Sequence, residues 1–247
     1  MTLHELPLLL GLVLVHLVAD FLLQSKTWIT EKNTRHYHSK YVYLHSAIHG
    51  LLSWPLIWAV VEDQYLSLST AALIGFSHAL FDIGKSYTPE GKFSWFILDQ
   101  ILHLSVILLV WLYLTDQWPL LQQTWVWLIS PKTLLVLIAY ILVMRPCAFV
   151  IATIIGKWGR EIDNSGSLLR SGTRIGLIER FLILTFIMID QFSTIGFLLV
   201  AKSVFRFGDL RENRNRQYTE YVLFDTLISF TLAITLGLVL KAALSSL

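Results

Sequence analysis

Four pairs of metal-ligand side chains, each spaced one helical turn apart, lie within the first 103 residues: His16 and Asp20, His45 and His49, His78 and Asp82, and Asp99 and His103. Residues four positions apart share one face of a helix, so each pair can direct two donors at one point. The surrounding segments are strongly apolar, and ionisable groups inside a membrane are costly enough to indicate a function. We therefore predict that these pairs form one shared polar site inside a membrane.

The donor types indicate the chemistry of that site. Five imidazoles and three carboxylates without a thiolate suit Zn, Fe, Mn or Ni. A catalytic zinc usually takes three protein ligands, so either two ions share these donors or some residues orient the ligands by hydrogen bonds. We expect a divalent metal, zinc first with Fe and Mn as alternatives, and favour a dinuclear centre that hydrolyses a phosphoester. Asp20, Asp82 and Asp99 are the expected catalytic carboxylates, with Gln24 and Gln100 as candidate hydrogen-bond partners.

The composition indicates which class of protein must position these residues. Hydrophobic residues make up 55% of the 247-residue chain and charged residues only 15%, whereas a soluble domain has about 25% charged residues. We predict an all-α fold, a polytopic integral membrane helix bundle. The lone Cys147 excludes an intrachain disulfide, and a net charge of +2 gives no reason to expect nucleic-acid binding.

Apolar segments long enough to cross a bilayer predict about eight transmembrane helices. They cover residues 6–23, 41–61, 66–83, 95–115, 132–155, 175–190, 193–208 and 218–244. The sixth and seventh are short and carry charges, so the expected range is six to eight, and these two segments could instead form a re-entrant hairpin. Residues 1–115 are expected to form a metal-site half and residues 116–247 a half with basic loops, within one integrated membrane domain.

Lysine and arginine alternate between the predicted loops. The loops after the first, third, fifth and seventh segments are basic, whereas the connections at 62–64, 115–125 and 190–193 contain no Lys or Arg. Short basic loops stay in the cytoplasm, so we expect both termini outside and a multi-pass location in the bacterial cytoplasmic (inner) membrane. This orientation places all four pairs in the cytoplasmic half of the membrane.

Several segments of the chain resemble a bacterial family of integral membrane proteins catalogued as a domain of unknown function. They are HLVADFLLQSKTW, HSAIHG, SHALFDIGK and DQILHL, and later GTRIGLIERFLIL, GFLLVAKSVFRFGDL and TEYVLFDTLISF, so the resemblance runs along nearly the whole chain. It implies a membrane fold but no activity. The chain departs from the family pattern at Asp225, where a small residue is expected, so Asp225 is not counted as a site residue. More loosely, the helix-borne His and Asp pairs are similar to those of predicted membrane-bound metal-dependent hydrolases.

A second candidate site lies in the later half. Lys202 and Arg206 are one helical turn apart and could hold the phosphate of a substrate. The alternative is that they anchor to lipid head groups, or that Glu179 or Glu220 neutralises them.

These observations favour an enzyme, a membrane-embedded metal-dependent hydrolase acting on a lipid or lipid-linked phosphoester at the cytoplasmic leaflet. Two alternatives stay open: a transporter or sensor of a divalent metal or protons, and a non-haem di-iron oxidase of acyl chains. The expected partners are membrane lipids and the lipid-linked substrate, without nucleic acid. Self-association into a homo-oligomer stays open.

Overall fold

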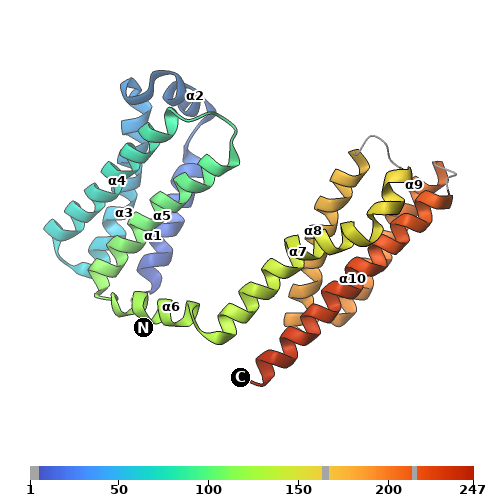
Figure 1. Ribbon diagram of the computed structural model, residues 1–247. Helices are drawn as coiled ribbons and strands as arrows, with labels where there is room; N and C mark the ends of the chain where they lie inside the picture. Colours follow the sequence, from blue (N-terminus) through green and yellow to red (C-terminus); the bar gives the residue numbers. More distant parts are fainter. Residues whose placement is uncertain (1–5, 163–166, 213–215) are drawn as a thin grey trace. The chain divides into compact units, whose positions relative to one another are not determined.

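The computed structural model describes residues 6–162, 167–212 and 216–247, with side chains described in these ranges outside 156–173 and 205–222. Every regular element among these residues is helical (Figure 1), which confirms the all-α fold class. Six helical segments are long and apolar enough to span a membrane: Leu6–Leu23, Lys40–Val61, Gln64–Ser86, Phe93–Thr115, Pro131–Ile155 and Leu223–Ser245. The protein is therefore a multi-pass membrane protein.

The two remaining predicted spans fall on helices α8 (Ser167–Met188) and α9 (Phe192–Glu212). Within the described residues neither belongs to the six long apolar segments, although α9 begins with a shorter apolar stretch, Phe192–Val204. The described part of the chain thus supports the lower end of the predicted range of six to eight.

The chain divides into two compact units, Met1–Gln123 and Thr124–Leu247. In the first unit, four long helical segments pack as a bundle, α2 lies across one end of it, and α6 follows the last long helix (Figure 1). These elements are α1 (Leu6–Val18), its π-helical continuation η1 (Ala19–Leu23), α2 (Lys26–Arg35), the single 3₁₀ turn η2 (His36–His38), α3 (Lys40–Val61), α4 (Gln64–Ser86), α5 (Phe93–Thr115) and α6 (Pro119–Leu128).

Polar caps fix where three of these helices begin. The hydroxyl of Ser25 accepts from the Trp28 amide at 3.3 Å at the start of α2, and Ser39 does the same for Tyr41 at the start of α3. The Asp63 carboxylate accepts from two amides at 2.9 and 3.0 Å at the start of α4. Such caps satisfy amide groups that a helix leaves without partners.

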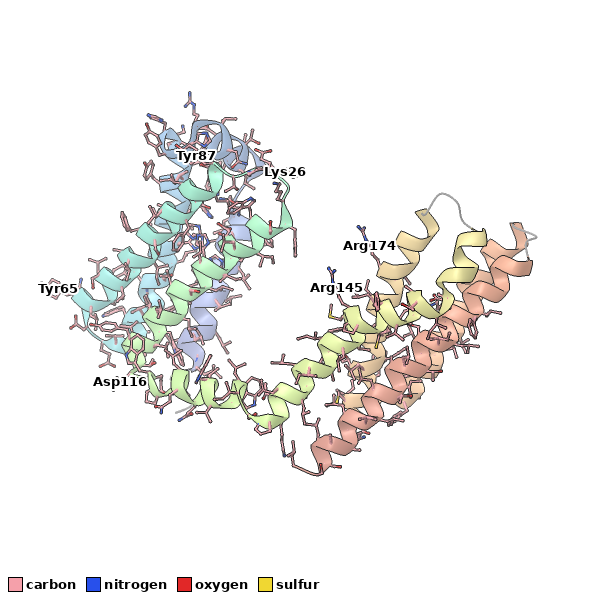
Figure 2. The ribbon with its side chains drawn as sticks, viewed as in Figure 1. Lys26, Tyr65, Tyr87, Asp116, Arg145 and Arg174 are labelled. Carbon is pink, nitrogen blue, oxygen red and sulfur yellow. The ribbon has the colours of Figure 1, made fainter. Side chains whose placement is uncertain are left out.

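The segment that contains α2 was predicted to be a basic loop, but it forms a helix that packs against the end of the bundle. The Asn33 amide donates to Glu90 at 2.9 Å, and the His36 ring contacts the Ser86 hydroxyl at 2.9 Å and stacks on Tyr87. His36 is therefore half-buried, whereas His38 is exposed. Figure 2 shows Tyr87 and Lys26 at the same end of the unit, so α2 covers the end at which α4 finishes.

Two glycines let α3 and α4 approach closely. A Cβ atom at Gly75 would lie 2.9 Å from the Ser46 carbonyl oxygen, and one at Gly50 would lie 3.1 Å from the Ala71 carbonyl oxygen. The backbones can therefore come closer than larger residues would allow. Ser46 and Gly50 directly follow His45 and His49 in α3, and Gly75 precedes His78 by three residues in α4, so this close approach bears on how near those rings can come.

An apolar core fills the other half of the bundle. It consists of Leu8, Leu12, Ile57, Ala71, Ile74, Ile107, Val110, Trp111 and Leu112. These residues come from the start of α1 and α4 and the end of α3 and α5. The four His and Asp pairs come from the opposite ends of the same segments, so the ionisable pairs lie at one end of the bundle and the apolar core at the other.

The second unit packs α7 (Pro131–Ile162), α8, α9 and α10 (Arg216–Ser245) around its own apolar core, which includes Val143, Ile183 and Phe230. Pro146 lies inside α7, where it removes one helical hydrogen bond. The buried Arg180 guanidinium donates to the carbonyl oxygens of Val143 at 2.8 Å and Met144 at 3.2 Å. Arg180 therefore ties α8 to the part of α7 that Pro146 loosens.

Candidate metal centre

The Asp20 carboxylate is the point at which the first three pairs converge. Its Oδ1 lies 3.1 Å from the Nε2 atoms of both His45 and His49 and 3.5 Å from that of His78. Its Oδ2 lies 3.6 Å from the Nε2 of His16. We call these five residues, Asp20, His16, His45, His49 and His78, the Asp20 group; they come from α1 with η1, α3 and α4.

These distances match what one metal ion requires. Two ligands bound at about 2.1 Å and at a tetrahedral angle lie about 3.4 Å apart. In the described residues the donor atoms of His16, Asp20, His49 and His78 all lie within 4.8 Å of one another. These four members of the Asp20 group can therefore hold a metal ion, whose identity the donors alone do not fix, while His45 forms a further set of such donors with His78 and Asp82.

Asp20 reaches this position because α1 ends in a π-helical turn, η1. A π turn contains more residues than an α turn, so it changes which direction the following side chains take, and such turns are frequent at functional sites. The Asp20 side chain is 13% exposed, whereas those of its four imidazole neighbours are at most 3% exposed. Asp20 is thus the accessible member of its group.

The fourth pair forms a second set of donors with Asp82. Asp82, Asp99 and His103 place one ligand atom each within 4.8 Å of one another, and all three residues are buried. We call these three residues the Asp99 group. The Nδ1 of His103 donates to the Asp99 backbone carbonyl at 2.8 Å, which fixes the ring, because a carbonyl can only accept. The His103 Nε2 is buried without a hydrogen-bond partner in the described part of the chain, and this is the geometry of an imidazole prepared to bind a metal.

The rings of the two groups touch. The ring centroids of His78 and His103 lie 4.1 Å apart, those of His49 and His78 lie 3.6 Å apart, and those of His16 and His103 lie 5.4 Å apart. The structure thus brings all eight residues of the four pairs into one cluster. Their roles as metal ligands and catalytic carboxylates stay predictions.

Gln100 links the groups and was anticipated as a hydrogen-bond partner. Its amide nitrogen lies 3.1 Å from Asp20 Oδ2 and 3.3 Å from Asp99 Oδ2, and its oxygen lies 3.4 Å from His16 Nε2. A single amide can therefore orient both carboxylates.

Two lysines of the cluster were missed by the sequence analysis. Lys32 of α2 is buried and its ammonium lies 2.7 Å from Asp82 Oδ2, while the Lys85 ammonium lies 2.6 Å from Asp99 Oδ2. Lys32 falls in the segment that the sequence predicts to be a basic cytoplasmic loop. Its contact with Asp82 could not be predicted, because it depends on how α2 packs against the bundle. Lys85 could have been found from the sequence, because it follows Asp82 by one helical turn and therefore lies near the same face of α4.

The second candidate site, Lys202 and Arg206, belongs to the second unit. The Lys202 ammonium lies 2.5 Å from Glu179 Oε2, the neutralisation that had been considered for it. The side chains of Arg206 and Glu220 lie outside the described residues. Whether Lys202 and Arg206 bind a substrate anion stays a prediction.

Comparison with known proteins bears on the first unit above all. Residues 8–136, just over half of the chain, match the family described as "Protein of unknown function (DUF3307)". This stretch contains both groups of the cluster, whereas the later segments included in the resemblance lie beyond it. No curated protein and no solved structure matches the chain, so the likeness to membrane-bound hydrolases has no named relative behind it. The chain belongs to the DUF3307 family.

Proposed function

We propose that the protein is a membrane-embedded, metal-dependent hydrolase of a lipid or lipid-linked phosphoester. The observation that carries this proposal is the Asp20 group, in which four imidazole nitrogens from three helical segments surround one carboxylate. Neutral imidazole and carboxylate donors suit zinc first, with iron and manganese as alternatives. Apart from Asp20, these side chains are nearly inaccessible to water, and burying so many ionisable groups in an apolar bundle is costly unless they are used.

The residues of the cluster divide the work of such a reaction. An ion held by the Asp20 group would supply an activated water and polarise a phosphoryl oxygen. The Lys32 and Lys85 ammoniums each contact one carboxylate. Each keeps further N–H groups that can donate to an anionic oxygen of the substrate. Asp82 and Asp99 hold those lysines in place, and Gln100 orients Asp20.

The open side of the cluster supports an apolar substrate. Asp20 and Gln100 are partly accessible, and they belong to η1 and α5. The exposed rings of Phe21 and Phe96, from the same two segments, pack edge to face at 6.3 Å. An acyl or isoprenoid chain can lie along these rings while its phosphoester reaches Asp20.

The charge pattern supports work at the cytoplasmic leaflet of a bacterial inner membrane. Figure 2 displays Lys26 and Tyr87 at the end of the first unit near α2, and Tyr65 and Asp116 at the other end. The α2 end carries the lysines of the first and third loops, whereas the connection between α3 and α4 contains none. By the preference of basic loops for the cytoplasm, the cluster faces the inner leaflet. Membrane lipids and the substrate are then its expected partners.

The two other candidate functions have less support. A carrier needs polar groups through the whole membrane, but the described half of the first unit opposite the cluster has an apolar core that includes Leu12, Ile57 and Leu112. Its buried polar residues are hydroxyl side chains, and those of Ser67 and Thr70 donate to nearby backbone carbonyls. A di-iron oxidase of the ferritin-like kind uses several bridging carboxylates, and here two of the three carboxylates pair with lysine.

Turnover of a lipid phosphoester by the full-length chain tests the proposal. The protein in detergent is expected to release phosphate or a phosphorylated head group from an inner-membrane lipid extract, to stop after removal of metal with a chelator, and to resume when zinc is restored. Turnover that persists after the metal has been removed would reject the metal-dependent mechanism.

A further inference from the structure

The three carboxylates of the cluster differ in their cationic neighbours. Asp82 pairs with Lys32 and Asp99 pairs with Lys85. Among the described residues, Asp20 contacts only imidazoles and the Gln100 amide, without a lysine or arginine. The Asp20 group therefore keeps one carboxylate charge that no ammonium balances.

This difference decides where a divalent ion binds. An ion at Asp82 and Asp99 would have to share their oxygens with two ammoniums, and like charges at such short range repel strongly in an apolar surrounding. Lys32 cannot move away freely, because its side chain is 7% exposed, Asn33 of α2 bonds Glu90 in the loop after α4, and His36 of the adjoining turn η2 bonds Ser86 at the end of α4. An ion at Asp20 meets no such competitor.

The charges of the whole cluster lead to the same conclusion. Counted formally, three carboxylates and two ammoniums leave a single negative charge on the cluster, because an imidazole adds no charge in the form that binds a metal. One divalent ion would reverse that charge to a single positive one, which a phosphate anion can balance, whereas two ions would leave three positive charges in an apolar bundle. His103 contacts Asp99, the carboxylate that Lys85 also contacts, and its buried Nε2 has no hydrogen-bond partner in the described residues; with one ion at the Asp20 group this nitrogen binds no metal.

We propose that the centre holds one divalent ion, bound by the Asp20 group, and that Lys32 and Lys85 take the place of a second ion in the Asp99 group. The inference rests on the metal centre of the proposed function and is independent of the substrate. It replaces the dinuclear centre favoured from donor number alone with one ion beside two fixed ammoniums.

Metal content of the full-length chain tests this assignment. The purified protein is stripped with a chelator, reloaded with excess zinc, desalted and analysed for zinc and protein. We expect one zinc per chain in the parent protein and in Lys26→Met, a control that removes an exposed lysine from the same helix α2. Lys32→Met combined with Lys85→Met is expected to raise the content to two, because the freed carboxylates then accept a second ion.

Two further variants keep the test decisive if the double variant fails to fold. Lys85→Met removes the more exposed ammonium, which is 33% exposed, and is expected to strengthen binding of a second zinc about tenfold or more in a titration. Lys32→Arg keeps the charge and is expected to stay at one ion. Two ions in the parent protein, or an unchanged second affinity in a folded Lys85→Met, would overturn the inference while leaving a metal-dependent hydrolase intact. No bound zinc in the parent protein would reject the metal centre itself, whereas one zinc without turnover would count against the substrate alone.

Discussion

Asp20 differs from the other carboxylates of the cluster in its contacts. It is the one carboxylate in contact with imidazoles from three helical segments, and it is also the most accessible member of its group. Asp82 and Asp99 have a different role, because each is occupied by a lysine. The sequence pattern predicts the same role for all three aspartates, whereas the structure gives them different neighbours.

Replacing Asp82 separates those roles. Asp82→Asn is expected to keep the ion, because the Asp20 group is untouched, but to lower kcat/KM by about one to two orders of magnitude, because Lys32 loses a charge-assisted contact of about 1.5 to 3 kcal/mol. Zinc content and lipid-phosphoester turnover are measured on the same preparation. Asp116→Asn, a change at an exposed residue beyond α5, is the matched control. Full turnover in Asp82→Asn would remove Asp82 and Lys32 from the reaction.

At the scale of the helices, close packing of α3 against α4 positions the residues of the cluster. His45 and His49 can meet His78 because Gly75 and Gly50 let the backbones of α3 and α4 nearly touch. Similarly, the π-helical turn η1 places Asp20 among rings that a regular α-helical turn would orient differently. The polar cluster thus depends on backbone features that carry no functional group.

Gly75→Ala tests the contact between α3 and α4. The added methyl group would lie 2.9 Å from the Ser46 carbonyl oxygen, and overpacking of this kind costs about 1 to 3 kcal/mol. A lower melting temperature and weaker zinc binding are expected, measured by thermal unfolding in detergent and by zinc titration. Gly84→Ala, in the same helix with nothing within 4 Å of the new Cβ, should melt at or slightly above the parent temperature. Equal behaviour of the two variants would contradict the role given to the close contact.

Much of this element-level organisation could be predicted from the sequence. The spacing of His16 with Asp20 and of Asp99 with His103 predicted shared helix faces, and the alternation of basic loops placed all four pairs at one level, where the structure brings them together. The docking of α2 could not be predicted, because the burial of Lys32 depends on tertiary contacts that helical periodicity does not encode. Nor does any local pattern announce the π turn that carries Asp20.

At the scale of the whole molecule, the protein is multi-pass, and the family match from residue 8 to 136 contains the entire cluster. The second unit adds polar contacts of its own, Glu179 with Lys202 and Arg180 with the carbonyls near Pro146. These contacts join α8 to α9 and to α7.

The orientation of the first unit can be tested with single cysteines on a Cys147→Ala background. A cysteine at exposed Lys26, at the α2 end in Figure 2, should react in intact cells only with a membrane-permeant thiol reagent, whereas one at exposed Gln122 should react with an impermeant reagent. This follows from the preference of basic loops for the cytoplasm. The reverse labelling would put the cluster at the outer leaflet and require a different pool of substrates.

The central claim is that a metal ion binds the Asp20 group through imidazole and carboxylate. X-ray absorption at the zinc edge on the zinc-reloaded, full-length chain tests it most directly, because one spectrum reports both the presence of the ion and the kind of its ligands. The account predicts nitrogen and oxygen neighbours at about 2.0 to 2.1 Å with the outer scattering of imidazole rings, and loss of this signal together with the zinc in Asp20→Asn. A sulfur neighbour at about 2.3 Å, or a spectrum that Asp20→Asn leaves unchanged, would contradict it.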